Sequence, residues 1–373
     1  MAALGPGTAT LVCLDVPVGT EFGIDYEAFR TAERFQGVKL LPVGLHFVFY
    51  ASTGEHDGIR QGFFIDVQAG DVLLRKWSND TEEILPLQDA RDAENLTRAV
   101  RGFQLDGNLG AYPQKHCKTW RRLSKYISHS VLQRCGVSLG TTLMPGDPDI
   151  MSTDEPGTVA AYFPNTAQTA RFTSLKKPTL ARSAAEVTQY HLDSSEHLAF
   201  LLETHYGNDW KELLGELQLA FVLFLFISSL DALQQWKQLV WLLCSSEAAV
   251  ATKPELFTSF LALMHAHLDQ VGAEFFQDEV AEHNFLQASL ASLFEILHDD
   301  TLDAKLLAKS RKLQAFLQQK FALRFDVLDT YAFGDDDCAP TVVLPDELPA
   351  YVLNDSVLDD AANAAAAANL FRH

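Results

Sequence analysis

With 373 residues, 47% of them hydrophobic and 21% charged, the chain is long enough for two domains that each bury a core. Its formal net charge of −20 argues against a general nucleic-acid binder, because contacts between cations and phosphates supply most of that affinity. The five cysteines are odd in number, scattered and never spaced as CxxC, and no signal-peptide pattern is present. These features argue against a secreted disulfide framework and indicate reduced thiols in the cytosol or nucleus.

The beginning of the chain is typical of β structure. Residues 10–15 have a strand-like pattern, in which Thr10, Val12 and Leu14 alternate with Leu11, Cys13 and Asp15, and strand-like runs follow at 38–41, 46–51, 62–67 and 72–77. The turn at residues 68–71, between the last two runs, predicts a β-hairpin. Because phenylalanines blur the alternation, we expect strands covered on both faces, as in a sandwich or a small closed barrel.

Near residue 90 the hydrophobic period changes to that of helices. The apolar face of a first helix carries Leu96, Val100 and Phe103. A second helix, which can start at Pro113, has its apolar face at Trp120, Leu123, Ile127 and Val131. Residues 136–182 are rich in Pro-Gly turns and predict a connection between a β-rich domain over 1–135 and an all-helical domain over 183–325.

The most apolar stretch of the chain lies within residues 210–244. Its hydrophobic residues at 213–227 cover every side of a helical wheel, which is typical of a helix enclosed by other helices or by a membrane. Glu216 and Asp231 bound the uncharged part, which is shorter than the ~20 residues that a bilayer span needs. We therefore predict the buried axis of a helical domain.

Several further helices are predicted around this axis. Capping-box patterns at residues 183–186, 193–196 and 252–255 predict helix starts. Two apolar stripes follow, one at Leu233, Trp236, Val240 and Leu243, the other at Leu256, Phe260, Leu263 and Met264. The first is flanked by Gln234, Gln235 and Gln238, which we expect to stay on the polar face. Segments 275–298 and 301–325 supply the last helices, and the final one exposes Lys305, Lys309, Arg311, Lys312 and Lys320.

A search for catalytic chemistry finds none of the familiar nucleotide-binding, metalloprotease or nucleophile motifs. His265 and His267 are two residues apart, so on a helix they point to different faces and cannot share a metal. We expect surface or partly buried histidines there. No cysteine or carboxylate joins His191, His197 and His205 at ligand spacing. The sequence predicts no enzyme activity, no metal and no cofactor.

One basic segment, residues 115–126, could bind RNA. It combines cations with Trp120 and Tyr126, and single-stranded RNA needs neutralised phosphates and stacked bases. The simpler interpretation uses Trp120 for packing, because it shares core spacing with Leu123 and Ile127, and leaves the cations on a solvated face. We prefer the simpler one because the chain as a whole is acidic.

The acidic tail, residues 326–373, contains one unusual island. Residues 326–360 hold ten acidic residues and neither Lys nor Arg. Between Pro340 and Pro345 stand Thr341, Val342, Val343 and Leu344, which favour an extended conformation. Such a segment can add a strand to its own sheet or dock on the exposed sheet edge of a partner, and composition alone slightly favours the first.

Several stretches closely resemble the AAR-two splicing factor family, in collinear order from about residue 9 to about residue 345. They are GTEFGIDY (19–26), RFQGVKLLPVGLHFVFYAS (34–52), LGAYP (109–113), EVTQYHLDSS (186–195), LLGELQLAFVLFLF (213–226), WKQLVWLLC (236–244), and DCAP with TVVLP (337–345).

The resemblance implies a β-rich N-terminal domain, a helical C-terminal domain and a non-catalytic assembly chaperone of the U5 snRNP in pre-mRNA splicing. Such a chaperone holds the RNase H-like and Jab/MPN-like domains of the large U5 scaffold protein and delays docking of the helicase and of RNA. In that mode Thr341, Val342, Val343 and Leu344 become partner-binding residues. The alternative is a direct RNA-binding splicing component that uses residues 115–126. We expect a monomer without membrane contact, resident in cytoplasm and nucleus.

Overall fold

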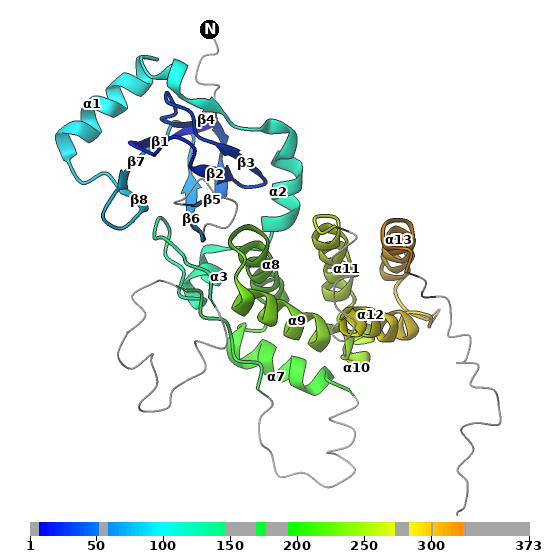
Figure 1. The fold of residues 1–373 in the computed structure, drawn as a ribbon. Helices are drawn as coiled ribbons and strands as arrows, with labels where there is room; N and C mark the ends of the chain where they lie inside the picture. The colour runs from blue at the N-terminus through cyan, green and yellow to red at the C-terminus, as the bar shows by residue number, and fades with distance from the viewer. Residues whose placement is uncertain are drawn as a thin grey trace, which may run out of the picture. The chain divides into compact units, whose positions relative to one another are not determined.

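The computed structural model describes residues 7–51, 59–146, 169–176, 193–272, 283–299, 301–323 and 325. The chain divides into two units, residues 1–325 and 326–373, and everything described here belongs to the first unit. Strands dominate its N-terminal part and helices its C-terminal part (Figure 1), so the predicted α+β class is confirmed.

The N-terminal part contains two β-sheets, as a sandwich-like arrangement predicts. One sheet has the order β8-β7-β1-β4-β9, with β1 Thr8–Leu14, β4 Gly37–Pro42, β7 Val72–Ser78, β8 Glu83–Pro86 and β9 Gly110–Ala111. The other has the order β3-β2-β5-β6, with β2 Glu21–Ile24, β3 Glu27–Arg30, β5 Gly44–Ala51 and β6 Arg60–Val67. The turn-rich stretch at residues 19–26 thus leads into a small β2–β3 hairpin.

The hairpin predicted at residues 68–71 is wrong. Strand β6 pairs with β5, whereas β7 pairs in parallel with β1 and antiparallel with β8. The tight turn itself exists, since the backbone N–H of Gln68 donates to Asp71 Oδ2 at 2.7 Å. Two of its backbone groups bind β1, since Gly70 N donates to Thr8 O and Thr10 N donates to Asp71 O. The turn therefore carries the chain from one sheet to the other.

The second sheet is covered on both faces, as the blurred alternation indicates. One face contributes Phe22, Val48, Phe63 and other residues to a core that it shares with the first sheet. From the opposite face, Phe47, Phe49 and Phe64 belong to the core of the helices. Glycine is needed at Gly23 and Gly62, since a Cβ there would collide with the rings of Phe49 and Phe47.

The segment that follows the sheets forms short helices. They are α1 Ala90–Arg101, α2 Cys117–Ser124 and α3 His129–Arg134, with 3-10 turns at Asp106–Asn108 and Gln114–His116. Phe103 was predicted to share an apolar helix face, but it lies beyond the end of α1 at a φ of 60° and is 48% exposed.

The single long helix predicted after Pro113 is broken between α2 and α3. The backbone N–H of Tyr126 donates to the side chain of Gln218 at 2.7 Å, and Ser128 caps α3 by accepting from Val131 N. Opposite this break stands Gly215, where a Cβ would collide with the carbonyl oxygen of Tyr126. The predicted apolar positions Trp120, Leu123, Ile127 and Val131 are nevertheless all buried.

The described helices of the C-terminal part are α7 Ser195–His205, α8 Trp210–Ile227, α9 Leu230–Cys244, α10 Glu247–Thr252, α11 Pro254–Leu268, α12 His283–Ile296 and α13 Ala304–Phe321. Helix α8 is buried along most of its length and packs against α9, α11, α2 and α3, which confirms the predicted axis. The ring of Phe226 on α8 stacks on Phe49 of β5 at 5.1 Å between centroids, so the two parts share one core. In the part of the chain that the structure describes, no helix has the length and hydrophobicity of a membrane span.

Two of the predicted helix starts lie in the described part. At residues 193–196 Asp193 accepts from the N–H and hydroxyl of Ser195, and α7 begins there. Helix α11 begins at Pro254 as expected, but its N-cap is Lys253 without a side-chain hydrogen bond, because Thr252 still belongs to α10. The start predicted at 183–186 lies outside the described residues.

The apolar stripes of α9 and α11 are confirmed, with Leu233 partly and the other predicted positions fully buried. Two polar residues that we expected to be exposed are not fully exposed. Gln235 is buried instead of exposed, and Lys320 is only half-exposed because its ammonium binds the carbonyl oxygens of Leu268 and Asp269 at the end of α11.

Candidate partner-binding surface

The predicted docking strand, Thr341, Val342, Val343 and Leu344, lies outside the described residues. The described residues offer three candidate regions, which are the basic segment 115–126, the histidines and a groove along α9.

The basic segment does not present its tryptophan to solvent. Trp120 is 2% exposed, and its indole N–H donates to the carbonyl oxygen of Leu45 at 2.7 Å, which fastens α2 to β5. Lys115 lies 3.3 Å from Glu27, and Lys125 lies over the ring of Tyr126. The structure thus uses Trp120 for packing, as the simpler interpretation predicts, and leaves cations such as Arg121 on the surface.

Two of the histidines considered as metal ligands, His197 and His267, are buried inside the protein. His267 is fully buried, its ring stacks on Phe221 at 4.1 Å, and its Nδ1 accepts from the indole N–H of Trp236 at 3.1 Å. Burial lowers the pKa of His267 to about 3, so the ring is neutral. Full burial of His267 goes beyond the surface or partly buried position that we expected. His197 is buried and His205 exposed, while His191 lies outside the described residues. Among the described residues no cluster of His, Cys, Asp or Glu could hold a metal ion.

A buried carboxylate organises the surface next to α9. Glu216, in the middle of α8, is fully buried, and its oxygens accept from Thr173 N and Oγ1 at 2.8 Å each and from Gln235 Nε2 at 2.9 Å. Gln235 also donates to the carbonyl oxygen of Thr173 at 3.0 Å. These bonds fix the extended segment 169–176 against α8 and α9.

The positive partner of this carboxylate comes from α3. Arg134 Nε lies 3.4 Å from Glu216, and its Nη1 donates to Glu212 at 2.6 Å. Burial disfavours the charged guanidinium, but the hydrogen bond to Glu212 and the charge of Glu216 outweigh it and raise the pKa of Arg134. The cluster therefore holds a permanent ion pair between elements that are far apart in sequence.

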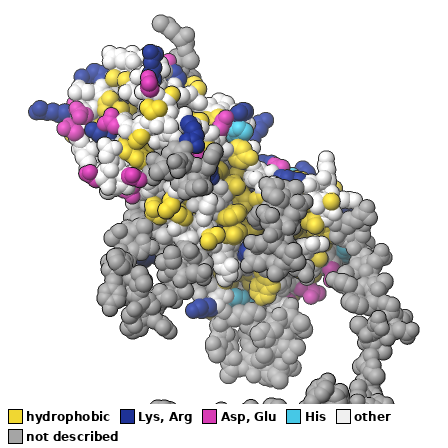
Figure 2. Space-filling model, viewed as in Figure 1, with side chains coloured by type: hydrophobic (Ala, Val, Ile, Leu, Met, Phe, Trp, Pro, Cys, Tyr) yellow, Lys and Arg dark blue, Asp and Glu magenta, His cyan; other side chains and the backbone are white. Residues whose placement is uncertain are grey.

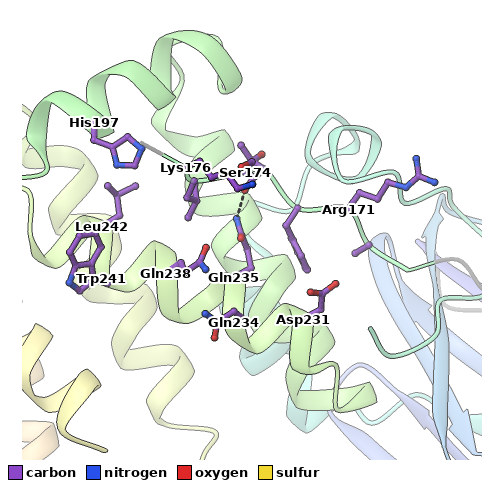
Figure 3. A pocket seen from close by; sticks show the side chains of 14 residues that line it. Arg171, Ser174, Lys176, His197, Asp231, Gln234, Gln235, Gln238, Trp241 and Leu242 are labelled. Carbon is purple, nitrogen blue, oxygen red and sulfur yellow. Dashed lines mark hydrogen bonds between the residues drawn. The ribbon is translucent and has the colours of Figure 1, made fainter. Parts of the chain in front are cut away.

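A groove of about 670 Å³ runs between the segment at 170–176 and α9 (Figure 3). Figure 3 shows Gln235 pointing toward the segment, with its hydrogen bond dashed, and Trp241 and His197 at one end of the groove. The segment contributes the cations Arg171 and Lys176, and α9 contributes Asp231 and exposed glutamines. A groove with an aromatic, an arginine and amide groups has the composition of a protein-binding surface.

The exposed face of α9 is one stripe that reaches beyond the groove. It consists of Leu230, Gln234, Gln238 and Trp241, spaced at four, four and three residues, of which the last three line the groove. Leu230 is 52% and Trp241 39% exposed. Figure 2 shows hydrophobic side chains gathered in the middle of the molecule's visible face, over the region of α8 and α9. Leu230 and Trp241 are thus two large apolar groups on a stripe that is otherwise polar.

Comparison with known proteins identifies the family. The family description "AAR2 N-terminal domain" matches residues 7–137, and "AAR2 C-terminal repeat region" matches residues 172–326. The human "Protein AAR2 homolog" is 32% identical over 370 residues, which covers 91% of this chain and 94% of that protein. The chain belongs to the AAR2 family. The Caenorhabditis elegans AAR2 homolog is 27% identical, covering 85% of this chain and 95% of the relative. The "A1 cistron-splicing factor AAR2" of Saccharomyces cerevisiae is 22% identical, covering 64% of this chain and 71% of the relative.

The two AAR2 family matches lie on the two parts that share the Phe226 contact, and the second match begins within the segment at 169–176. Sequence reasoning missed the groove because it assigned Gln234, Gln235 and Gln238 together to a solvated face. The available signal was Trp241, three residues after Gln238, since a solvated face seldom carries tryptophan.

Proposed function

We propose that this AAR2 family member acts in pre-mRNA splicing as a non-catalytic assembly chaperone of the U5 snRNP. It binds the RNase H-like and Jab/MPN-like domains of the large U5 scaffold protein and delays docking of the helicase and of RNA. It works as a monomer in cytoplasm and nucleus. The observation that carries the proposal is the near full-length similarity to AAR2 proteins, one of which bears the name of a splicing factor.

The described surfaces are compatible with a protein partner. The α9 stripe offers Leu230 and Trp241 as apolar anchors, with Gln234 and Gln238 as hydrogen-bonding groups between them. The ion-pair cluster around Glu216 fixes the opposite wall of the groove, so little order has to be gained on binding. In the basic segment, by contrast, Trp120 is not available for stacking a base.

Affinity capture with the full chain tests the proposal. We expect the U5 scaffold protein to be enriched and to stay bound after nuclease treatment, because the contact is between proteins. Loss of the scaffold on nuclease treatment would instead favour the RNA-binding alternative. In that case Arg121→Glu together with Arg122→Glu should abolish a salt-dependent shift of single-stranded RNA.

The tail strand has a separate test in the full chain. Val343→Asp/Leu344→Asp places charge in the strand-forming island and should weaken capture of the scaffold's two C-terminal domains. Val357→Asp/Leu358→Asp, an identical Val-Leu pair further along the same tail, is the matched control and should leave capture unchanged. Equal capture by wild type and both variants would remove the tail strand from the proposal.

A further inference from the structure

A small basic pocket lies between α2, α11 and α13, apart from the α9 groove. Its volume is about 240 Å³, and its lining consists of Arg122 from α2, Leu261, Ala262 and His265 from α11, and Lys309, Lys312 and Leu313 from α13. Helix α11 packs against both α2 and α13, which brings together cations 190 positions apart in the sequence (Arg122 to Lys312). Neither the family resemblance nor the proposed function assigns a role to this pocket.

One wall of the pocket is a fixed guanidinium. Arg122 Nη2 lies 3.0 Å from His265 Nδ1, and Arg122 Nη1 lies 3.5 Å from Asp269 Oδ2. Because a guanidinium only donates hydrogen bonds, His265 must accept at Nδ1, and the proton of its neutral ring sits on Nε2. The His265 ring is held from the other side by Phe316, at 4.2 Å between centroids.

The opposite wall carries two lysines from one helix face. Lys309 and Lys312 are three residues apart on α13, so both can point at the same cavity, and both are exposed. Burial, Arg122 and these two lysines lower the pKa of His265, while Asp269 opposes them. Arg122, Lys309 and Lys312 line the pocket, whereas Asp269, the carboxylate that contacts Arg122, is not among the lining residues. Like charges held this close are stabilised when an anion enters.

The shape of the pocket selects the kind of anion. Its volume is below the ~300 Å³ at which pockets for small organic molecules begin, so it suits one anionic group and not a whole nucleotide. The buried Leu261 and Leu313 give the pocket an apolar floor, which suits the aliphatic stem of a side chain and strengthens the local charges. The lining contains no Phe, Tyr or Trp, and its one ring, His265, already contacts Arg122 and Phe316, which leaves little for a nucleic-acid base to stack on.

We propose that the pocket formed by Arg122, Lys309 and Lys312 binds the phosphate group of a phosphorylated side chain on a protein partner. A guanidinium fork beside two ammonium groups is a common arrangement for phosphate recognition. Phosphate is favoured over a carboxylate because it brings nearly two charges and three acceptor oxygens against three cations. The site stands apart from the proposed function, since it requires no particular partner protein.

Calorimetric titration of the full chain at low ionic strength tests the site with three short peptides that carry no other charge. They differ at one position, which is phosphoserine, glutamate or serine. We expect the phosphoserine peptide to bind about tenfold or more tightly than the other two, because hydrogen bonds between charged groups are the strong ones. Lys309→Glu and Lys312→Glu should each remove this preference. Arg311→Glu is the control, since it makes the same charge change at an exposed neighbour that does not line the pocket.

Several outcomes would overturn the site. They are equal binding of all three peptides, a glutamate peptide that binds as tightly as phosphoserine, a loss in Arg311→Glu as large as that in Lys312→Glu, or tighter binding of single-stranded RNA at the same pocket. A second readout locates the ligand. Phosphate in the pocket should raise the pKa of His265 in an NMR titration, because it neutralises the cations that lower it, and should leave His205, exposed on α7, unchanged.

Discussion

Two buried carboxylates, one in the strand-rich part and one among the helices, fasten distant segments by different chemistry. Asp25 accepts from His46 Nδ1 at 2.7 Å, from Phe47 N at 3.0 Å and from Tyr112 Oη at 2.5 Å. Glu216 accepts from Arg134, Thr173 and Gln235. Each carboxylate is almost completely removed from solvent.

The difference lies in the positive partner. Both ring nitrogens of His46 lie 2.7 Å from oxygen acceptors, Asp25 Oδ2 and the carbonyl of Pro42, so both bonds form only when the imidazole is protonated. Burial disfavours that charge, but the bond and charge of Asp25 outweigh it and raise the pKa of His46. Arg134 does not titrate in the accessible range. The two clusters do the same structural work, but only in the first one can the positive partner lose its charge as the pH rises.

Glu216→Ala should have the largest effect on stability. It leaves Arg134 with Glu212 as its one carboxylate partner, removes the acceptor of Thr173 N and Oγ1, and leaves Gln235 with its bond to the carbonyl oxygen of Thr173. We expect the free energy of unfolding in urea to fall by about 3–5 kcal/mol, the cost of breaking a buried pair. Glu212→Ala is the control, because that side chain is 19% exposed and Glu216 remains in place. An equal loss in both variants would contradict the central position of Glu216.

Asp25→Asn should cost less and depend on pH. At pH 6 we expect a loss of about 1–3 kcal/mol, typical of hydrogen bonds that involve charge. The pKa of His46 is higher in the folded state than its unfolded value near 6.5. Its contribution to the free energy of unfolding is therefore complete below pH 6.5 and disappears as the pH rises through the raised pKa. The loss of unfolding free energy caused by Asp25→Asn should therefore become smaller as the pH rises from 6 to 9, while the loss caused by Glu216→Ala stays constant. Parallel unfolding curves from pH 6 to 9 measure both, and identical pH profiles would refute the distinction.

At neutral pH the titration of His267 should have the smallest effect on stability, and in acid its effect has the opposite sign to that of His46. Its pKa is lowered to about 3, so stability is complete above the unfolded value near 6.5 and falls as the pH is lowered. Below pH 6.5, replacing His267 with Gln should reduce the slope of the unfolding free energy against pH by at most about 1.4 kcal/mol per pH unit. The exposed His205→Gln serves as the control. If His267→Gln and the wild type lose stability equally as the pH is lowered, the ring is not kept neutral in the folded protein.

The sequence was a good guide wherever the signal was local. Strands β1, β4, β5, β6 and β7 and the start of α7 were predicted within a few residues, because alternation and capping involve neighbours in the chain. The same reasoning failed for the pairing of β6 and β7, since a turn does not reveal which strands bind its two arms. It also missed the break after α2, although Ser128 was an available capping signal.

The candidate site was less predictable than the fold. Gln235 and its neighbours Gln234 and Gln238 have the same side chain, yet Gln235 is buried against Glu216 and the others line the α9 groove. Nothing local distinguishes them, because their environments come from the segment at 169–176, more than 50 residues away in the chain. The basic pocket is a similar case, since Arg122 meets Lys309 and Lys312 only after α2 and α13 have both packed on α11.

By itself, the sequence determined the α+β class, the buried axis at residues 213–227 and the family, since each depends on composition, period or residue order along the chain. Only the tertiary structure decided which polar side chains are buried in ion-pair clusters and which form surfaces. Burial of a charge is favourable only when its partners arrive from other elements, and for Asp25 and Glu216 those partners lie as far as 87 and 82 positions away.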